Sequence, residues 1–203
     1  MTLGIVLMLV TGFTSCSGNS TDNENSMDTK QLTEMFRHRR SVRQYDKSPV
    51  AEEKLNAILE AGMTAPTGDN THEVECIVVQ ERATLDSLSH IRKVGTRMLE
   101  TAGAAIIVVA NPDKTDLWME DASISMAYMH LAADALGLGS CWIQMWNRDA
   151  ADGQDLEPVM RERFGIPSYM RILAILSLGN TNSHPAPHDA DYMNWNKVHK
   201  ERY

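Results

Sequence analysis

The sequence has few of the residues that would point at once to a fold or a ligand. It contains three cysteines in 203 residues, too few for a disulfide framework. Cys16 lies near the N-terminus, and Cys76 and Cys141 lie in apolar runs, which predicts two buried thiols rather than a disulfide. Nor is there an excess of basic residues: the net charge is −8, which argues against nucleic acid as a partner because phosphate binding needs a basic face.

Familiar catalytic motifs are also missing. The chain has no Gly-x-Ser-x-Gly elbow, no Walker A loop and no His-Glu-x-x-His pair. His184 and His188 are four residues apart, but Pro185 and Pro187 interrupt that segment, so the spacing carries no helical geometry. The sequence therefore predicts no metal site and no familiar catalytic constellation.

No apolar run near the N-terminus is long enough to span a membrane. Residues 3–13 are apolar and uncharged, which suits a signal peptide but falls short of the roughly 20 residues of a span. Small residues and Cys16 follow this run. Residues 1–16 therefore resemble a bacterial lipoprotein signal in which Cys16 is the lipidated residue. Residues 17–28 are expected to form a flexible polar tether. The alternatives are an ordinary cleaved signal or a simple anchoring helix. The expectation is an exported protein of the periplasm or cell envelope that contacts the membrane only through its N-terminus.

From residue 28 onward the apolar pattern alternates between helical and strand periods. Helices are expected over 28–40, from Pro49 to the start of a loop at 62–70, and over 83–100, 117–136 and 156–164. Strands are expected over 74–80, 104–110, 140–146 and 170–178. This order predicts one domain over 29–203, an α+β fold in three layers (α/β/α), with a polar tail after residue 180.

The helix expected over 117–136 is apolar on nearly every side, with Trp118, Ile124, Met129 and Leu136 among its large residues. A domain of this size can cover only part of such a helix, so a second copy of the chain is the natural cover. The alternative is a central helix enclosed within one protomer.

The densest cationic segment is Arg39, Arg40, Ser41 and Arg43. If the chain is extended there, Arg39, Ser41 and Arg43 project to one side because side chains alternate along a strand. Two guanidinium groups and a hydroxyl would suit a phosphate dianion. The segment could equally be the solvated basic end of a helix.

Four landmarks occur in order along the chain, and together they resemble the nitroreductase family of flavoproteins. They are Arg39-Arg40-Ser41-Val42-Arg43 with Tyr45, Ala65-Pro66-Thr67-Gly68-Asp69-Asn70, Gly137-Leu-Gly-Ser-Cys-Trp-Ile143, and a strand that ends in Leu178-Gly179. The resemblance extends from about Lys30 to the C-terminus. It implies a central mixed sheet flanked by helices, a homodimer, and FMN as the cofactor.

The resemblance also implies roles for particular residues. Arg39, Arg40, Ser41 and Arg43 would hold the FMN phosphate and ribityl chain, with Lys197 or Lys200 as a further cation on the phosphate. Pro66, Thr67 and Asn70 would approach the flavin of the partner subunit. Trp142, Ile143 and Gln144 would line the isoalloxazine, with a backbone N–H near Gln144 donating to flavin N5. After Asn70 the chain departs from the family pattern, and Glu73 and Glu75 place negative charge near the expected pocket edge.

The function implied is hydride transfer from NAD(P)H through FMN to a nitroaromatic, a quinone or a similar acceptor, by a ping-pong mechanism. Because a flavin carries the chemistry, no protein nucleophile or acid–base pair is required. Two alternatives stay open: other flavin chemistry such as dehalogenation or flavin breakdown, and an exported flavin-binding lipoprotein that relays electrons or binds a partner.

Overall fold

The computed structural model describes residues 27–203. Cys16, the signal expected over 1–16 and nearly all of the tether expected over 17–28 lie outside the described residues. The first helix, α1 (Thr29–His38), begins where the sequence predicts, because Asp28 accepts a hydrogen bond from the backbone N–H of Gln31.

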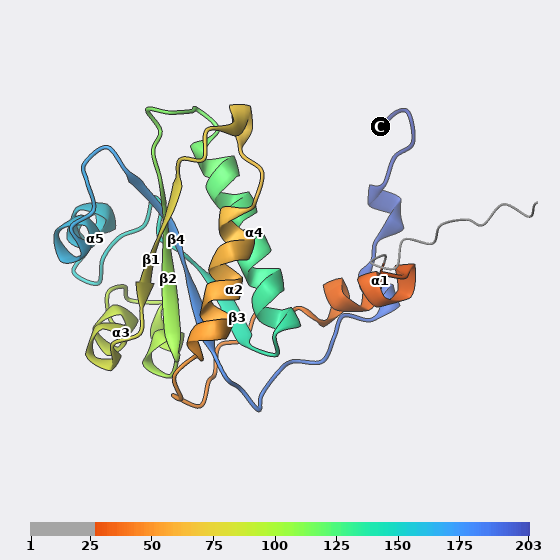
Figure 1. The fold of residues 1–203 in the computed structure, drawn as a ribbon, viewed down its shortest axis with the longest axis horizontal. Coiled ribbons are helices and arrows are strands. Elements are labelled where there is room, and N and C mark those ends of the chain that lie inside the picture. Colours follow the sequence, from red (N-terminus) through yellow and green to blue (C-terminus); the bar gives the residue numbers. More distant parts are fainter. Residues whose placement is uncertain (1–26) are drawn as a thin grey trace, which may run out of the picture.

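Four strands form a central sheet in the order β1-β2-β4-β3 (Figure 1). Their bounds are β1 Val74–Val79, β2 Ala104–Ala110, β3 Gly139–Gln144 and β4 Arg171–Gly179. All three strand pairs are antiparallel, and the parallel component is one isolated bridge between Ser41 and Ser140. The α+β class is confirmed, but the expected mixed sheet is an antiparallel sheet with one parallel bridge at the edge of β3.

Helices cover both faces of this sheet, which gives the three predicted layers (Figure 1). The bounds are α2 Glu52–Met63 and α4 Trp118–Ala135 on one face, and α3 Arg82–Ser89 and α5 Leu156–Phe164 on the other. Neighbouring residues of β2 enter different cores: Ile106 packs with α2 and α4, and Ile107 packs with α3 and α5. A strand covered on both faces explains why 104–110 is apolar without interruption.

The first helix and the C-terminal tail form an arm beside the three layers (Figure 1). The backbone N–H of His188 donates to the carbonyl of Arg37 at 2.9 Å, which joins the tail to α1. No residue of α1 is buried, and the tail contains only two short 3-10 turns, η3 (Ala190–Tyr192) and η4 (Trp195–Lys197). None of the described helices has both the length and the apolar character needed to cross a membrane.

The helix predicted over 83–100 is wrong in its second half. α3 ends at Ser89, because the hydroxyl of Ser89 donates to the carbonyl of Asp86 and Thr96 donates to the carbonyl of Ser89. These side chains compete with the helical hydrogen bonds. A turn through Gly95, at φ +88°, then leads to a short 3-10 helix, η2 (Arg97–Glu100).

Candidate functional site

The segment that carries the arginines lies along the edge of β3. Ser41 forms the parallel bridge with Ser140, and the Val42 N–H donates to the Ser140 carbonyl at 2.9 Å. The close approach requires a glycine in β3, because a Cβ on Gly139 would lie 2.7 Å from Val42 Cγ1. Val42 and Tyr45 enter the core, and the Tyr45 hydroxyl donates to the Val42 carbonyl at 2.7 Å. The apolar anchors thus leave Ser41 and Arg43 outside the core.

Three polar side chains of this segment influence the pKa of the Cys141 thiol in β3. Burial raises the pKa of Cys141, while Arg43, a hydrogen bond from Ser41 and the charge of Arg39 act in the opposite direction. Arg40 points elsewhere and donates to the carbonyl of Ala186 in the tail. Alternation along an extended chain therefore separates Arg40 from the other three residues.

These guanidinium groups have no anionic partner within residues 27–203. Arg39 donates to Nε2 of His130 at 3.1 Å, and Arg43 reaches only the carbonyl of Ser41 at 3.3 Å. The ion pairs of the described residues involve other cations. Burial, followed by the charge of Arg39, lowers the pKa of His130 to about 4, so this histidine adds no positive charge at neutral pH.

A cavity of about 710 Å³, large enough for a cofactor, opens beside the cluster. Its lining includes Ser41, Arg43 and Gln44 from the arginine segment and Arg97 and Thr101 from the opposite side. Cationic and hydroxyl donors without a protein anion are the donor set that a phosphate monoester requires. The residues present therefore fit a phosphate-bearing ligand.

The loop 65–70 is held to α4 by a buried carboxylate. The N–H of Gly68 donates to Oδ1 of Asp121 at 2.9 Å, and the His72 N–H donates to the Thr67 hydroxyl at 3.1 Å. Asn70 adopts φ +57° within the 3-10 turn η1 (Gly68–Asn70). Pro66 and Asn70 are exposed at the end of this loop, free to contact something outside the chain.

The expected location of Glu73 at the edge of a pocket is wrong. Glu73 does not bring charge to a pocket edge: it is buried, and its side chain accepts from the Thr71 hydroxyl. Oε1 of Glu73 and Oδ2 of Asp121 have no hydrogen-bond partner in the part of the chain that the structure describes. Burial, followed by the neighbouring Glu73, raises the pKa of Asp121. The two carboxyl groups form a buried pair under the loop.

β3 is the outer strand of the sheet next to this cluster. Beyond the bridge at Ser140, no described strand pairs with its free edge. Trp142 and Gln144 are partly exposed there, and the Trp142 indole N–H donates to Oε1 of Gln144 at 2.9 Å. An open edge presents backbone N–H and C=O groups that a planar ligand can use.

Comparisons with known proteins agree with this arrangement. The family model described as "Nitroreductase family" matches residues 36–102 and 86–180, which is more than half of the chain. The chain belongs to the nitroreductase family. It is 31% identical over 179 residues to an Archaeoglobus fulgidus protein with the provisional name NADH dehydrogenase/NAD(P)H nitroreductase, an alignment that covers 86% of this chain and 99% of that protein.

Two further relatives are informative. The FMN reductase [NAD(P)H] of Bacillus subtilis is 28% identical over 172 residues, covering 74% of this chain and 64% of the relative. The solved structure of an FMN-dependent nitroreductase from Clostridium difficile superposes with a TM-score of 0.81 at 36% identity, covering 84% of this chain and 99% of the other. The nitroreductase fold predicted from the four landmarks is confirmed.

The side chains of two residues that the family resemblance singles out lie in the core or on the arm of the single chain, and a role of Lys197 on the phosphate stays a prediction. The side chain of Ile143 is 2% exposed and packs in the core with α3 and α5, so only its backbone lies on the open edge. Lys197 lies in η4 on the arm, and the structure records no hydrogen bond or ion pair from its side chain within the described residues. Lys200, the other candidate cation, lies beyond η4 on the same arm.

The sequence alone did not predict several polar residues that lie beside the proposed site. His130 supports Arg39, and Arg97 lines the cavity opposite Arg43. Asp121 was hidden in the apolar 117–136 helix, where a buried acidic residue is itself unusual and could have been a signal. A second group, His38, Asp134 and His184, joins three distant segments, and no local pattern connects them.

Proposed function

We propose that this nitroreductase-family protein is an FMN-dependent NAD(P)H oxidoreductase. The observation that carries the proposal is the cluster of Arg39, Ser41 and Arg43, whose guanidinium groups have no anionic partner within residues 27–203 and which lies beside the open edge of β3. The relatives named as an FMN reductase and an FMN-dependent nitroreductase support the choice of FMN and NAD(P)H.

In this proposal the protein binds and orients, and FMN supplies the redox chemistry by accepting a hydride and passing electrons on. Arg39, Ser41 and Arg43 hold the phosphate, and Arg40 serves the ribityl chain or the tail that it contacts. The backbone of β3 at Ile143 and Gln144, with the Trp142 side chain, would line the isoalloxazine. Fixed N–H donors at that edge stabilise negative charge on the ring system.

The electron acceptor is proposed to be a nitroaromatic, a quinone or a similar planar oxidant, used in a ping-pong cycle. A planar acceptor would take the place that the nicotinamide leaves, so the two substrates would share one open face of the site. Initial rates at several fixed acceptor concentrations should give parallel double-reciprocal lines. Intersecting lines would contradict the ping-pong part of the proposal and leave the cofactor assignment intact.

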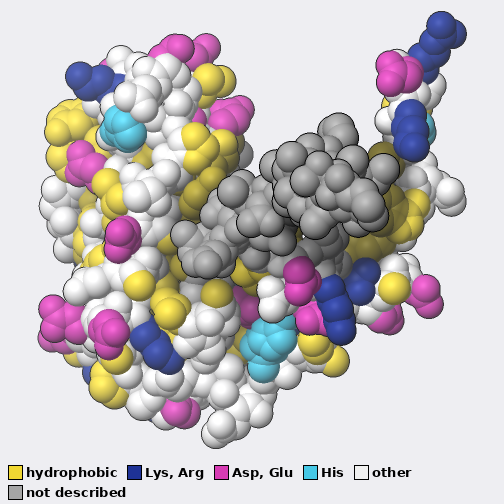
Figure 2. Space-filling view, turned by 45° about the vertical axis from the view of Figure 1, so that its right-hand side comes forward, with side chains coloured by type: hydrophobic (Ala, Val, Ile, Leu, Met, Phe, Trp, Pro, Cys, Tyr) yellow, Lys and Arg dark blue, Asp and Glu magenta, His cyan; other side chains and the backbone are white. Residues whose placement is uncertain are grey.

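The active form is proposed to be a homodimer. On α1, Leu32 is 42% exposed and Phe36 is 51% exposed, and Trp195 on the tail is 74% exposed. Ile124 and Tyr128 form a further exposed apolar surface on the outer side of α4. Figure 2 shows hydrophobic side chains on the arm and on the nearby face of the body. A second protomer that covers both surfaces would also let Pro66, Thr67 and Asn70 reach the partner's flavin.

Export is a further part of the proposal, supported by the apolar run at 3–13 and by Cys16. In this account the enzyme acts in the cell envelope, attached through a lipid on Cys16.

The donor is tested by mixing the purified yellow protein with NADH or NADPH in the absence of oxygen. Rapid loss of the oxidised flavin absorbance is expected. Reduction by dithionite or by a membrane fraction, without reduction by either nicotinamide, would overturn the enzyme assignment in favour of an electron relay.

A further inference from the structure

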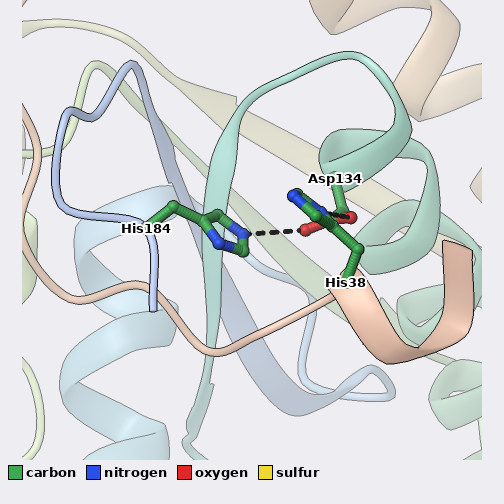
Figure 3. A group of neighbouring side chains, drawn as sticks. All are labelled: His38, Asp134 and His184. Carbon is green, nitrogen blue, oxygen red and sulfur yellow. Dashed lines mark hydrogen bonds and ion pairs between the residues drawn. The ribbon is translucent and has the colours of Figure 1, made fainter. Parts of the chain in front are cut away.

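Two histidines and an aspartate from three separate segments meet where the arm joins the body (Figure 3). His38 ends α1, Asp134 lies in the last turn of α4, and His184 belongs to the tail. His38 Nδ1 lies 2.7 Å from Oδ2 of Asp134, and His184 Nε2 lies 3.0 Å from Oδ1. The three side chains offer ligand atoms that all lie within 4.8 Å of one another.

The carboxylate at the centre of this group needs positive charge. The Asp134 side chain is 5% exposed, and it lies at the C-terminal end of an 18-residue helix. The helix dipole is negative at that end, so a buried carboxylate there is unfavourable unless a cation balances it. His38 and His184 are the charge partners that the structure gives to Asp134.

The two ring nitrogens of His184 both face hydrogen-bond acceptors, a mismatch because this requires one N–H more than a neutral imidazole has. Its Nδ1 lies 2.8 Å from the carbonyl oxygen of Pro185, and its Nε2 faces the Asp134 carboxylate. Both partners only accept, whereas a neutral imidazole carries one N–H. An imidazolium at His184 would supply both N–H groups, and a cation held between its Nε2 and the Asp134 carboxylate would satisfy the same two bonds. The His38 ring stacks on that of His184 at 4.4 Å, so one metal ion is a charge that all three side chains can share.

We propose that His38, Asp134 and His184 bind one divalent transition-metal cation of the zinc type. A cation between His184 Nε2 and Asp134 removes the mismatch, because Nδ1–H then donates to the Pro185 carbonyl. That is the outer hydrogen bond which zinc-ligating histidines usually make. Two imidazoles favour zinc, which also binds carboxylates, whereas magnesium and calcium prefer sites built from oxygen ligands.

The two N–O separations, 2.7 and 3.0 Å, involve different oxygens of Asp134, and both are close to those of a zinc site. Ligands about 2.0–2.2 Å from a tetrahedral zinc are roughly 3.3 Å apart, so the N–O pairs need to open by about half an ångström. A cavity of about 580 Å³ lined by His38, Asp134 and His188 provides an entry path and room for a water as the fourth ligand. The bound cation would connect α1, α4 and the tail at one point. This site is distinct from the arginine cluster and goes beyond the proposed redox function.

The test uses the full chain with its flavin, stripped of metal by a chelator and titrated with zinc against a chromophoric competitor. One zinc per chain is expected. His38→Gln and His184→Gln should each weaken binding by at least about 100-fold, since loss of an outer hydrogen bond alone costs about 10- to 100-fold. His199→Gln is the matched control, because His199 also lies in the tail but is not one of the three proposed ligands, and its ring contacts that of Tyr203.

Zinc-edge X-ray absorption of the wild-type complex should show two imidazoles and the remaining ligands as oxygen. Equal zinc affinity in the wild type and both glutamine variants, with flavin content unchanged, would overturn the site. A spectrum with fewer than two imidazoles would overturn it as well, even if a variant failed to fold. Neither result would bear on FMN binding, which is measured separately in the same samples.

Discussion

Ser41 and Ser140 are bridged in parallel, and this pairing places the arginine segment against the strand that is proposed to support the flavin. The bridge brings the segment of Arg39 and Arg43 to the edge of β3, where burial raises the pKa of the Cys141 thiol and both positive charges act, more weakly, in the opposite direction. One backbone contact thus connects the residues proposed to bind the FMN phosphate to the strand proposed to line the isoalloxazine.

Arg39→Ala and Arg43→Ala are each expected to weaken FMN binding by about 2–4 kcal/mol, because a phosphate would lose a charged donor in a partly buried site. Equilibrium dialysis of FMN against the purified variants measures the change. Arg163→Ala is the matched control, since Arg163 lies on α5 and its contacts are to Ser87 and the ring of Phe164. Full retention of FMN by both site variants on dilution would disprove the phosphate assignment.

The buried pair of Asp121 and Glu73 predicts a pH-dependent stability. Burial and Glu73 raise the pKa of Asp121 above its ordinary 3.8, so the folded state favours the protonated form. That stabilisation is complete below the ordinary pKa and is lost as pH rises through the raised value. Asp121→Asn keeps an acceptor for the Gly68 N–H and carries no charge, so its stability relative to wild type should grow as pH rises.

Urea unfolding of both proteins from about pH 4 to about pH 8 measures this difference. Asp116→Asn, an exposed aspartate just before α4, should show no such trend. A stability difference between Asp121→Asn and wild type that is flat or falls with pH would show that the pair is not protonated in the folded state.

If the exposed apolar side of α4 forms the dimer interface, a single charged substitution there should weaken the dimer. Ile124 is 38% exposed in the single chain, and Ile124→Glu would place a carboxylate in the proposed interface. The dimer dissociation constant should rise at least about tenfold, or about 1.4 kcal/mol. Sedimentation at micromolar concentration measures it, with Tyr169→Glu as control because Tyr169 is 52% exposed in the turn between α5 and β4. A wild-type monomer that holds FMN stoichiometrically would contradict the shared site.

Cys16 is expected to carry lipid. Labelled fatty acid should enter the wild type and not Cys16→Ala, and the variant should be released as soluble protein. Cys76→Ala controls for the loss of a thiol, because Cys76 lies in β1 within the domain. A soluble wild type whose N-terminus begins beyond residue 16 would show that the leader is only a cleaved signal.

Much of the fold could be predicted because its signals are local. The unbroken apolar run of β2 and the apolar α4 mark the centre of the sheet and its covering helix. Gly165 ends α5 in the left-handed conformation at φ +64°, as the sequence pattern indicates. The early end of α3 could not be predicted, since it depends on side-chain hydrogen bonds that apolar periodicity does not record.

Polar pairs were harder to foresee because they join distant residues. His38 and Asp134 are 96 positions apart, and His184 and Asp134 are 50 apart. Only the packing of α1 and the tail against α4 brings them together. The arginine segment could be found because its residues are adjacent in the sequence and alternate in a strand-like pattern.

The most direct test is to compare the binding of FMN and riboflavin to the purified chain. The two ligands differ only in the phosphate that Arg39, Ser41 and Arg43 are proposed to hold. One FMN per chain is expected, bound at least about 30-fold more tightly than riboflavin, the lower limit of the arginine contribution given above. A chain that binds no flavin, or binds riboflavin as tightly as FMN, would contradict the proposed cofactor site.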